Sequence, residues 1–111
     1  PYAPAYAALD LGTNNCRLLI AAPTTGGFRV LDSFSRIVRL GEGLGATNRL
    51  SEEAMERALE SLHACAQKLH RRPIRALTAV ATEACRRAEN GAAFLARVEQ
   101  ETGLRLRTIA A

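Results

Sequence analysis

A short polar stretch near the start of the sequence, DLGTNN from Asp10 to Asn15, separates two apolar runs. Asn and Gly tolerate positive φ, so the stretch could be no more than a hairpin connection. Alternatively it is an anion site, in which Gly12 lets the backbone approach a ligand and Thr13 and Asn14 supply donors to a phosphate. Asp10 ends an apolar strand, where burial of its carboxylate would be costly without a cation or donors beside it.

The cysteines and histidines do not follow the spacing of a metal site. Cys16, Cys65 and Cys85 are odd in number, far apart and without a CxxC pair, which argues against both a disulfide framework and a zinc site. A reducing cytoplasm fits this pattern. His63 and His70 lie seven residues apart on a predicted helix, and no Cys or carboxylate is spaced to complete a metal site with them. They are expected at the surface or at its boundary.

The sequence is basic, with a net charge of +4, and Lys68 is the only lysine among its 15 basic residues. Arginine suits bidentate phosphate contacts, so this composition is compatible with a polyanionic partner, although a genome rich in G and C would also favour arginine. Few aromatic residues and no RNA-binding signature argue against nucleic acid as the partner. No apolar stretch approaches the length of a membrane span, so no membrane partner is expected.

Apolar runs in the first half of the sequence predict three strands joined by hairpins, then a glycine-rich loop and a long amphipathic helix. Ser51 is expected to cap this helix, Glu52 and Glu53 lie in its first turn, and Pro73 stops it. The strands are expected at 6–11, 16–22 and 28–34, the third running on with a bend through 35–40, the loop at 41–50 and the helix at 51–71.

The second half of the sequence predicts a strand, two helices and a final strand. The first of these strands is apolar enough for burial inside a sheet. Thr82 is expected to cap a short helix, and Asn90 and Gly91 to begin another, which Gly103 ends. The strands are expected at 74–81 and 104–109, and the short helix at 83–88.

This order of elements predicts an α/β fold, a ribonuclease H-like mixed five-stranded sheet with flanking helices on its faces. The sequence shows no internal repeat, low-complexity stretch or linker, so residues 1–111 are expected to form one domain. The loop at Gly12 and the turn at Thr82 follow strands that would be neighbours in such a sheet. Both are therefore expected to open at the same end, where ligands of open α/β sheets bind.

Three segments, taken in this order and spacing, carry a resemblance to a known family. They are ALDLGTNNCRLLI, VRLGEGL and AVATEACRRAENGAAFLARVEQETGLRLRTI. Together they resemble the amino-terminal domain of the exopolyphosphatase and guanosine pentaphosphate phosphohydrolase family, the Ppx/GppA phosphatases, within the actin-like ATPase superfamily. The resemblance implies a hydrolase that cleaves terminal phosphoanhydride bonds of inorganic polyphosphate, of guanosine pentaphosphate or of both, with Mg²⁺ as its cofactor.

The resemblance also implies roles for residues in the two loops and in the glycine-rich segment. Asp10 is implied to be catalytic through Mg²⁺, as the metal ligand, and Arg86 to be catalytic as well as phosphate-binding. Arg39 and Glu42 are implied to line the cleft. The implied phosphate-binding positions are Gly12, Thr13, Asn14, Asn15, Arg17, Thr82 and Arg86.

Two positions depart from the family's pattern. Glu83 stands where many members have serine, so its carboxylate is expected to point away from a bound phosphate or to bind a cation. Asn15 replaces a small hydroxyl residue that is frequent in the phosphate motif. Neither change removes a donor that a phosphate loop requires.

The family's general base is a glutamate expected directly after the strand at 104–109, and the sequence stops at Ala111. The resemblance therefore implies a domain of a longer enzyme, inactive by itself because the glutamate segment and the second lobe are absent. It leaves open whether the parent protein is a homodimer.

Two other functions stay open at this point. The same loops would serve a non-catalytic module that binds a nucleotide or alarmone. A ribonuclease H-like nuclease would need several acidic residues around two metal ions, and the predicted strands supply essentially Asp10 alone.

Overall fold

A five-stranded mixed sheet forms the centre of the molecule, in a computed structural model that describes residues 4–109. The strands are β1 (Ala5–Leu11), β2 (Asn15–Thr24), β3 (Gly27–Ile37), β4 (Ile74–Ala81) and β5 (Arg107–Thr108). Their order across the sheet is β3-β2-β1-β4-β5. Pairing is antiparallel from β3 to β1 and parallel from β1 to β5. The predicted mixed sheet is confirmed, and β1 and β4 are neighbours as expected.

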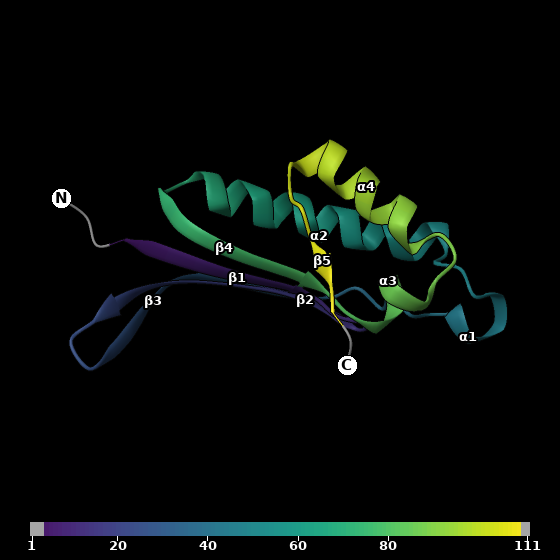
Figure 1. The fold of residues 1–111 in the computed structure, drawn as a ribbon, viewed down its shortest axis with the longest axis horizontal. Coiled ribbons are helices and arrows are strands. Elements are labelled where there is room, and N and C mark those ends of the chain that lie inside the picture. Colours follow the sequence, from purple (N-terminus) through teal and green to yellow (C-terminus); the bar gives the residue numbers. More distant parts are fainter. Residues whose placement is uncertain (1–3, 110–111) are drawn as a thin grey trace.

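The helices of the described part are α1 (Leu44–Thr47), α2 (Glu52–His70), α3 (Glu83–Arg87) and α4 (Gly91–Thr102). The two long helices, α2 and α4, lie side by side over one face of the sheet (Figure 1). Helix α2 connects β3 to β4, and α4 connects β4 to β5. Each connection joins two parallel strands, and both connections run in the same direction across the sheet. Because such crossovers are right-handed, the two helices are placed on the same face.

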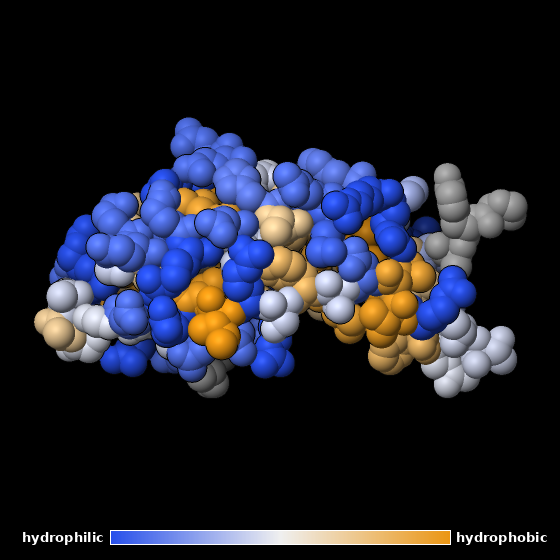
Figure 2. All heavy atoms as spheres, turned by 180° about the vertical axis from the view of Figure 1, so that it is seen from behind, coloured by the Kyte–Doolittle hydropathy of each residue, from blue (hydrophilic) through white to orange (hydrophobic). Residues whose placement is uncertain are grey.

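The strands alternate between this helix-covered face and the opposite one. Every second residue of β1 and β2 is buried, and the residues between them are mostly exposed. Helices were expected on the faces of the sheet, and within residues 4–109 they cover one. Figure 2 shows apolar residues gathered among hydrophilic ones on the molecule seen from behind. The exposed large apolar side chains are Tyr6, Leu19, Phe28, Val30, Ile37, Leu77 and Ile109.

Helix α2 begins as its sequence predicts. The Ser51 side chain accepts a hydrogen bond from the backbone N–H of Ala54, at 3.1 Å, and Glu52 and Glu53 occupy the first turn. One face of the helix is buried against the sheet, including Leu59 and Leu62. His63 and His70 are exposed, as expected. None of the helices in residues 4–109 combines the length and the apolar character needed to cross a membrane.

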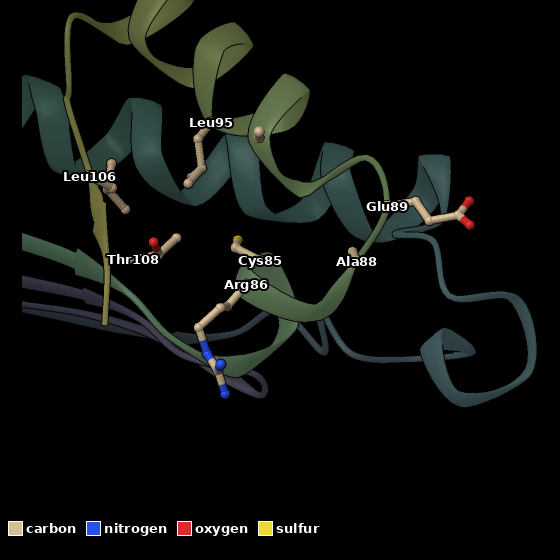
Figure 3. Close-up of a pocket in the computed structure, with 8 residues that line it drawn as sticks. Cys85, Arg86, Ala88, Glu89, Leu95, Leu106 and Thr108 are labelled. Atoms are coloured by element: carbon tan, nitrogen blue, oxygen red, sulfur yellow. The ribbon is translucent and has the colours of Figure 1, made fainter. Parts of the chain in front are cut away.

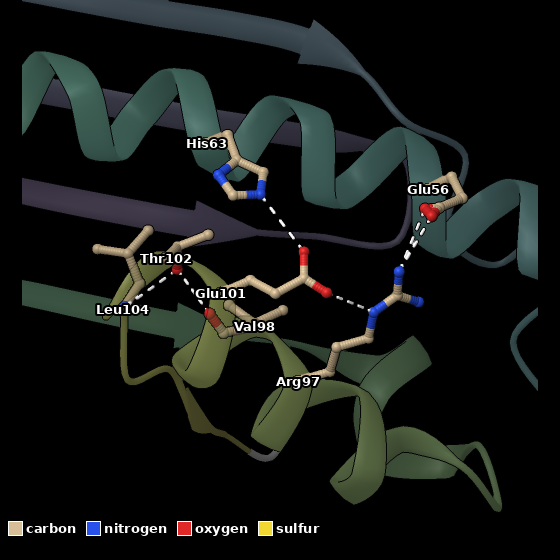
Figure 4. A network of polar contacts seen from close by, with 7 residues as sticks. All are labelled: Glu56, His63, Arg97, Val98, Glu101, Thr102 and Leu104. Atoms are coloured by element: carbon tan, nitrogen blue, oxygen red, sulfur yellow. Dashed lines mark hydrogen bonds and ion pairs between the residues drawn. The ribbon is translucent and has the colours of Figure 1, made fainter.

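A network of charged side chains joins α4 to α2 (Figure 4). Arg97 Nη2 lies 3.0 Å from Glu56 Oε1 on α2, and its Nε lies 2.8 Å from Glu101 Oε2, one turn along α4. His63 Nε2 lies 3.4 Å from Glu101 Oε1. Contact with the Arg97 guanidinium holds the pKa of the Glu101 carboxyl below its ordinary value. The network links α4, the helix that follows the candidate site, to α2.

Several expectations about local structure are wrong. The first half of β4 is mostly exposed, and only Ala79 and Ala81 are buried in this strand, because β5 pairs with just its last two residues. The final strand is accordingly shorter than expected. A helical turn, α1, occupies part of the predicted 41–50 loop. Thr82 and Asn90 both precede a helix, but neither side chain caps it, whereas Gly103 ends α4 at φ 78° as expected.

Candidate functional site

The loop between β1 and β2 is a tight turn. The Gly12 N–H donates to the carbonyl of Asn15 at 2.9 Å, which folds Thr13 and Asn14 outward as the tip. In residues 4–109 no backbone carbonyl accepts a hydrogen bond from the N–H of Thr13 or of Asn14. These two amides are the donors that the loop can offer to an anion.

The turn after β4 lies against this loop. The Thr82 N–H donates to the carbonyl of Leu11 at 3.1 Å, so the β4 turn continues the pairing between β1 and β4. A Cβ atom on Gly12 would lie 3.8 Å from Thr82 Oγ1. This distance is an ordinary van der Waals contact, so the two segments lie close together at the same end of the sheet.

The segment after β3 packs on the other side of the loop. The N–H groups of Val38 and Arg39 both donate to the carbonyl of Asn14, at 2.7 and 3.0 Å, and the Gly41 N–H donates to the carbonyl of Thr13 at 3.1 Å. A Cβ atom on Gly41 would lie 2.5 Å from Thr13 Cγ2, so only glycine fits without moving Thr13. The first residues of the VRLGEGL segment, 38–41, are thus part of the site.

The two charged residues predicted in that segment face each other. Arg39 Nε lies 3.6 Å from Glu42 Oε2, and both side chains are exposed. Glu42 also accepts from a second arginine, Arg57 of α2, at 3.2 Å. The carboxylate of Glu42 therefore lies between two guanidinium groups, which balance its charge.

Asp10 does not experience the burial expected from its place in an apolar strand. It precedes the last residue of β1 and is exposed, because its side chain belongs to the open face of the sheet. Arg17 is its register partner on β2, so opposite charges lie side by side on this face. With its amide oriented to satisfy its neighbours, Asn15 accepts from Arg17 Nη2 at 3.1 Å and donates to the carbonyl of Asn14 at 3.1 Å.

Arg86 forms an ion pair with Glu83, one of the two residues that depart from the family's pattern. Its Nη2 lies 2.6 Å from Glu83 Oε1, one turn earlier on α3. The Glu83 carboxylate therefore binds a cationic side chain, one of the two arrangements expected for it. Helix α3 has only five residues, so its dipole at Thr82 is weak, and the guanidinium of Arg86 adds a positive charge in its last turn.

A shallow pocket of about 380 Å³ lies beside Arg86, between α3, α4 and β5. Figure 3 shows the Arg86 side chain extended away from Leu95 and Leu106, so its charged end leaves this pocket rather than filling it. The pocket is not the space between the two loops. It is lined by Cys85, Arg86, Ala88, Glu89, Ala92, Leu95, Leu106 and Thr108.

The cysteines near the site are not poised as nucleophiles. Burial raises the pKa of the Cys85 thiol to about 12. The pKa of Cys16 is raised by its hydrogen bond with Cys65 and by burial. All three cysteines are free and buried in the structure. The raised pKa values keep the thiols of Cys16 and Cys85 protonated, and burial makes them small apolar core residues.

Two residues with long-range contacts are absent from the predicted site residues. Arg57 contacts the segment after β3, and the Asn90 side chain pairs with the backbone of Leu50 through hydrogen bonds of 2.8 and 3.0 Å. In the sequence, Arg57 occupies an ordinary polar position of an amphipathic helix, and Asn90 indicates only the start of a helix. No pattern in the sequence marks either contact, since both partners lie far away along the chain.

Comparison with known proteins identifies relatives over almost the whole chain. The model of the Ppx/GppA phosphatase family matches residues 19–111. Guanosine-5'-triphosphate,3'-diphosphate pyrophosphatases of Pseudoalteromonas translucida and Photobacterium profundum are 38% and 36% identical over 109 residues. These matches cover 98% of this chain and 22% of each relative, so the chain spans about a fifth of their length.

The fold is shared with solved members of the same family. The crystal structure of the Aquifex aeolicus family member matches with a TM-score of 0.91 and 34% sequence identity, covering 96% of this chain and 35% of that one. The predicted fold and the resemblance are confirmed by these matches. This chain belongs to the Ppx/GppA phosphatase family.

Proposed function

We propose that this chain is the phosphate-binding domain of a hydrolase that cleaves a terminal phosphoanhydride bond of guanosine pentaphosphate or inorganic polyphosphate. The observation that carries the proposal is the contact between the two loops, in which Thr82 N donates to the carbonyl of Leu11 at 3.1 Å. This contact supports one anion site with backbone N–H donors from Thr13 and Asn14 and a guanidinium from Arg86. Such donors suit a phosphate, whose charge is spread over several oxygens.

Guanosine pentaphosphate is the substrate we favour. Both curated relatives described above are named as pyrophosphatases of guanosine-5'-triphosphate,3'-diphosphate. Polyphosphate presents the same terminal phosphoanhydride group, so the site described here would bind either. The choice between them is tested by competition between the two compounds.

Mg²⁺ fits the donor set at this site, with Asp10 as its ligand. Asp10 offers one exposed carboxylate at the same end of the sheet as the loop amides. Mg²⁺ is commonly held by one or two carboxylates, with water and substrate phosphate oxygens completing its octahedron. When bound, the ion would neutralise charge on the phosphate, and the loop amides and Arg86 would orient it.

We further propose that residues 1–111 by themselves bind a phosphate group but do not hydrolyse guanosine pentaphosphate or polyphosphate. General-base catalysis contributes about 10² to 10⁴ in rate, and none of the carboxylates described at the loops is positioned as a base by a contact in the structure.

The three free, buried cysteines fit a reducing compartment, so we place the protein in the cytoplasm.

The test uses the full-length protein that carries this chain. Asp10→Asn is expected to lower Mg²⁺-dependent phosphate release by about 100-fold or more with little loss of stability, because it removes a charge and keeps the side-chain shape. Arg86→Ala is expected to raise KM about tenfold, the effect of losing a charged hydrogen bond. Arg87→Ala, the next residue of α3 and also exposed, is the matched control.

Unchanged kinetics in both Asp10→Asn and Arg86→Ala would refute the proposed site. A wild-type protein that binds guanosine pentaphosphate in calorimetry but releases no phosphate from it would instead support a binding module that uses the same loops.

A further inference from the structure

Arg57 reaches from α2 to the segment that follows β3. Its Nε donates to the carbonyl of Val38 at 2.8 Å, and its Nη2 donates to the carbonyl of Arg39 at 3.1 Å and to Glu42 Oε1 at 3.2 Å. The side chain is 29% exposed. One guanidinium thus binds two carbonyls and a carboxylate, which needs the planar fork of arginine and cannot be reproduced by lysine.

The opposite edge of the same segment is bound to the candidate phosphate loop. The N–H groups of Val38 and Arg39 both donate to the carbonyl of Asn14, at 2.7 and 3.0 Å. The backbone of these two residues therefore donates on one side to Asn14 and accepts on the other from Arg57. Helix α2 is connected to the loop tip through this single layer of backbone.

Arg39 is held in a conformation that residues with a Cβ atom rarely adopt. Its φ is +46°, in the left-handed region. Strain of this kind persists where the surrounding contacts fix the backbone, and it concentrates at functional sites. Here the contacts include the Asn14 carbonyl on the N–H side of Arg39 and the Arg57 guanidinium on its carbonyl side. The Glu42 N–H also donates to the carbonyl of Arg39, at 3.1 Å, so without Arg57 this carbonyl keeps one donor while the carbonyl of Val38 loses the Arg57 Nε donor.

We propose that Arg57 is a positioning residue for the phosphate site: by holding the carbonyls of Val38 and Arg39, it sets the place of the Asn14 carbonyl and hence of the Thr13 and Asn14 amides. The inference rests on the proposed function, because it assigns these amides to a phosphate. Arg57 itself touches neither substrate nor metal in this role. Misplacing a catalytic group by about 1 Å can lower a rate by about 100-fold, so a positioning residue can have a large effect at a distance.

The experiment compares Arg57→Ala and Arg57→Lys with wild type in the full-length protein, measuring phosphate release from guanosine pentaphosphate. Arg57→Ala is expected to lower kcat by about 10- to 100-fold and to change KM by less than about threefold, since the loop amides remain available but are less well placed. Arg57→Lys is expected to fall between the two, because it keeps the charge and one donor. Millimolar guanidinium chloride is expected to restore part of the kcat of Arg57→Ala.

Arg49→Ala is the matched control. Arg49 lies within the 41–50 segment and forms an ion pair with Glu89 at 3.6 Å, but it has no hydrogen bond to the backbone of Val38 or Arg39. Its kcat is expected to stay within about twofold of wild type, the range of a surface substitution. Should Arg57→Ala fail to fold, as judged by circular dichroism, Arg57→Lys carries the test with the same expected direction in kcat.

An unchanged kcat in a folded Arg57 variant would overturn the inference, whatever happens to KM. The proposed function would survive that result if Asp10→Asn and Arg86→Ala still lower activity. If those two variants are also unaffected, the proposed site itself has failed.

Discussion

Arg86 and Glu83 form an ion pair across one turn of α3, with Nη2 of Arg86 2.6 Å from Oε1 of Glu83. A phosphate bound by Arg86 would have to share this guanidinium with a carboxylate of its own sign. We therefore expect the pair to lower the affinity of the proposed site for anions.

Glu83→Gln is expected to tighten binding of inorganic tripolyphosphate by about three- to tenfold, the effect of about 1 kcal/mol between exposed charges. The gain should shrink as salt is added, because salt screens exposed charges. Isothermal titration calorimetry at two salt concentrations measures both effects. Glu89→Gln, which removes an exposed carboxylate paired with Arg49, is the control and should leave the affinity unchanged. Weaker binding by Glu83→Gln would contradict this role.

Gly41→Ala is expected to disturb the phosphate loop. The new Cβ atom would lie 2.5 Å from Thr13 Cγ2, so Thr13 must move. Phosphate release by the full-length protein is expected to fall on the order of 10- to 100-fold, the cost of a misplaced binding group. Gly45→Ala is the control, because among the described residues no heavy atom lies within 4 Å of its added Cβ. Equal activity of the two variants would show that Thr13 moves without consequence.

Asn90→Ala is expected to lower the free energy of unfolding by about 1–3 kcal/mol, because the N–H and carbonyl of Leu50 both lose a part-buried partner. Urea denaturation followed by circular dichroism measures the change. Gln100→Ala removes an exposed amide from the same helix and is expected to change stability by less than about 0.5 kcal/mol. A similar loss in both variants would contradict the importance of the Leu50 contact.

Asp32 is expected to make stability depend on pH. Lys68 Nζ lies 3.1 Å from Asp32 Oδ1, and this contact, with the N–H of Ser33, holds the pKa of the Asp32 carboxyl below its ordinary value of 3.8. A lowered pKa in the folded state means that the charged carboxylate stabilises the fold above about pH 3.8 and loses that effect as the pH falls through the folded-state pKa.

Asp32→Asn should therefore be less stable than wild type at neutral pH, and the difference should vanish in strongly acidic solution. Urea denaturation of both proteins across this range measures it. A difference that stays constant with pH would show that the Asp32 charge is not responsible.

Much of the secondary structure of this protein follows from local sequence. Ser51 caps α2 and Gly103 ends α4 where the sequence predicts, because both effects depend on residues within one helical turn. The strand at 74–81 has the predicted bounds, since an apolar run and the flanking Pro73 and Thr82 define it. The convergence of the two loops also followed from the sequence, because strand order and right-handed crossovers fix which strand ends are neighbours.

Only the tertiary structure decided which side chains at the site are buried, paired or held. Asp10 is exposed because its register places it on the face opposite α2 and α4, and a one-residue shift would have buried it. Asn90 pairs with Leu50, and Arg57 with Val38 and Arg39, across 40, 19 and 18 residues of sequence. Contacts of this kind depend on where whole elements pack, and the periodicity of a single element does not predict which distant residues it will contact.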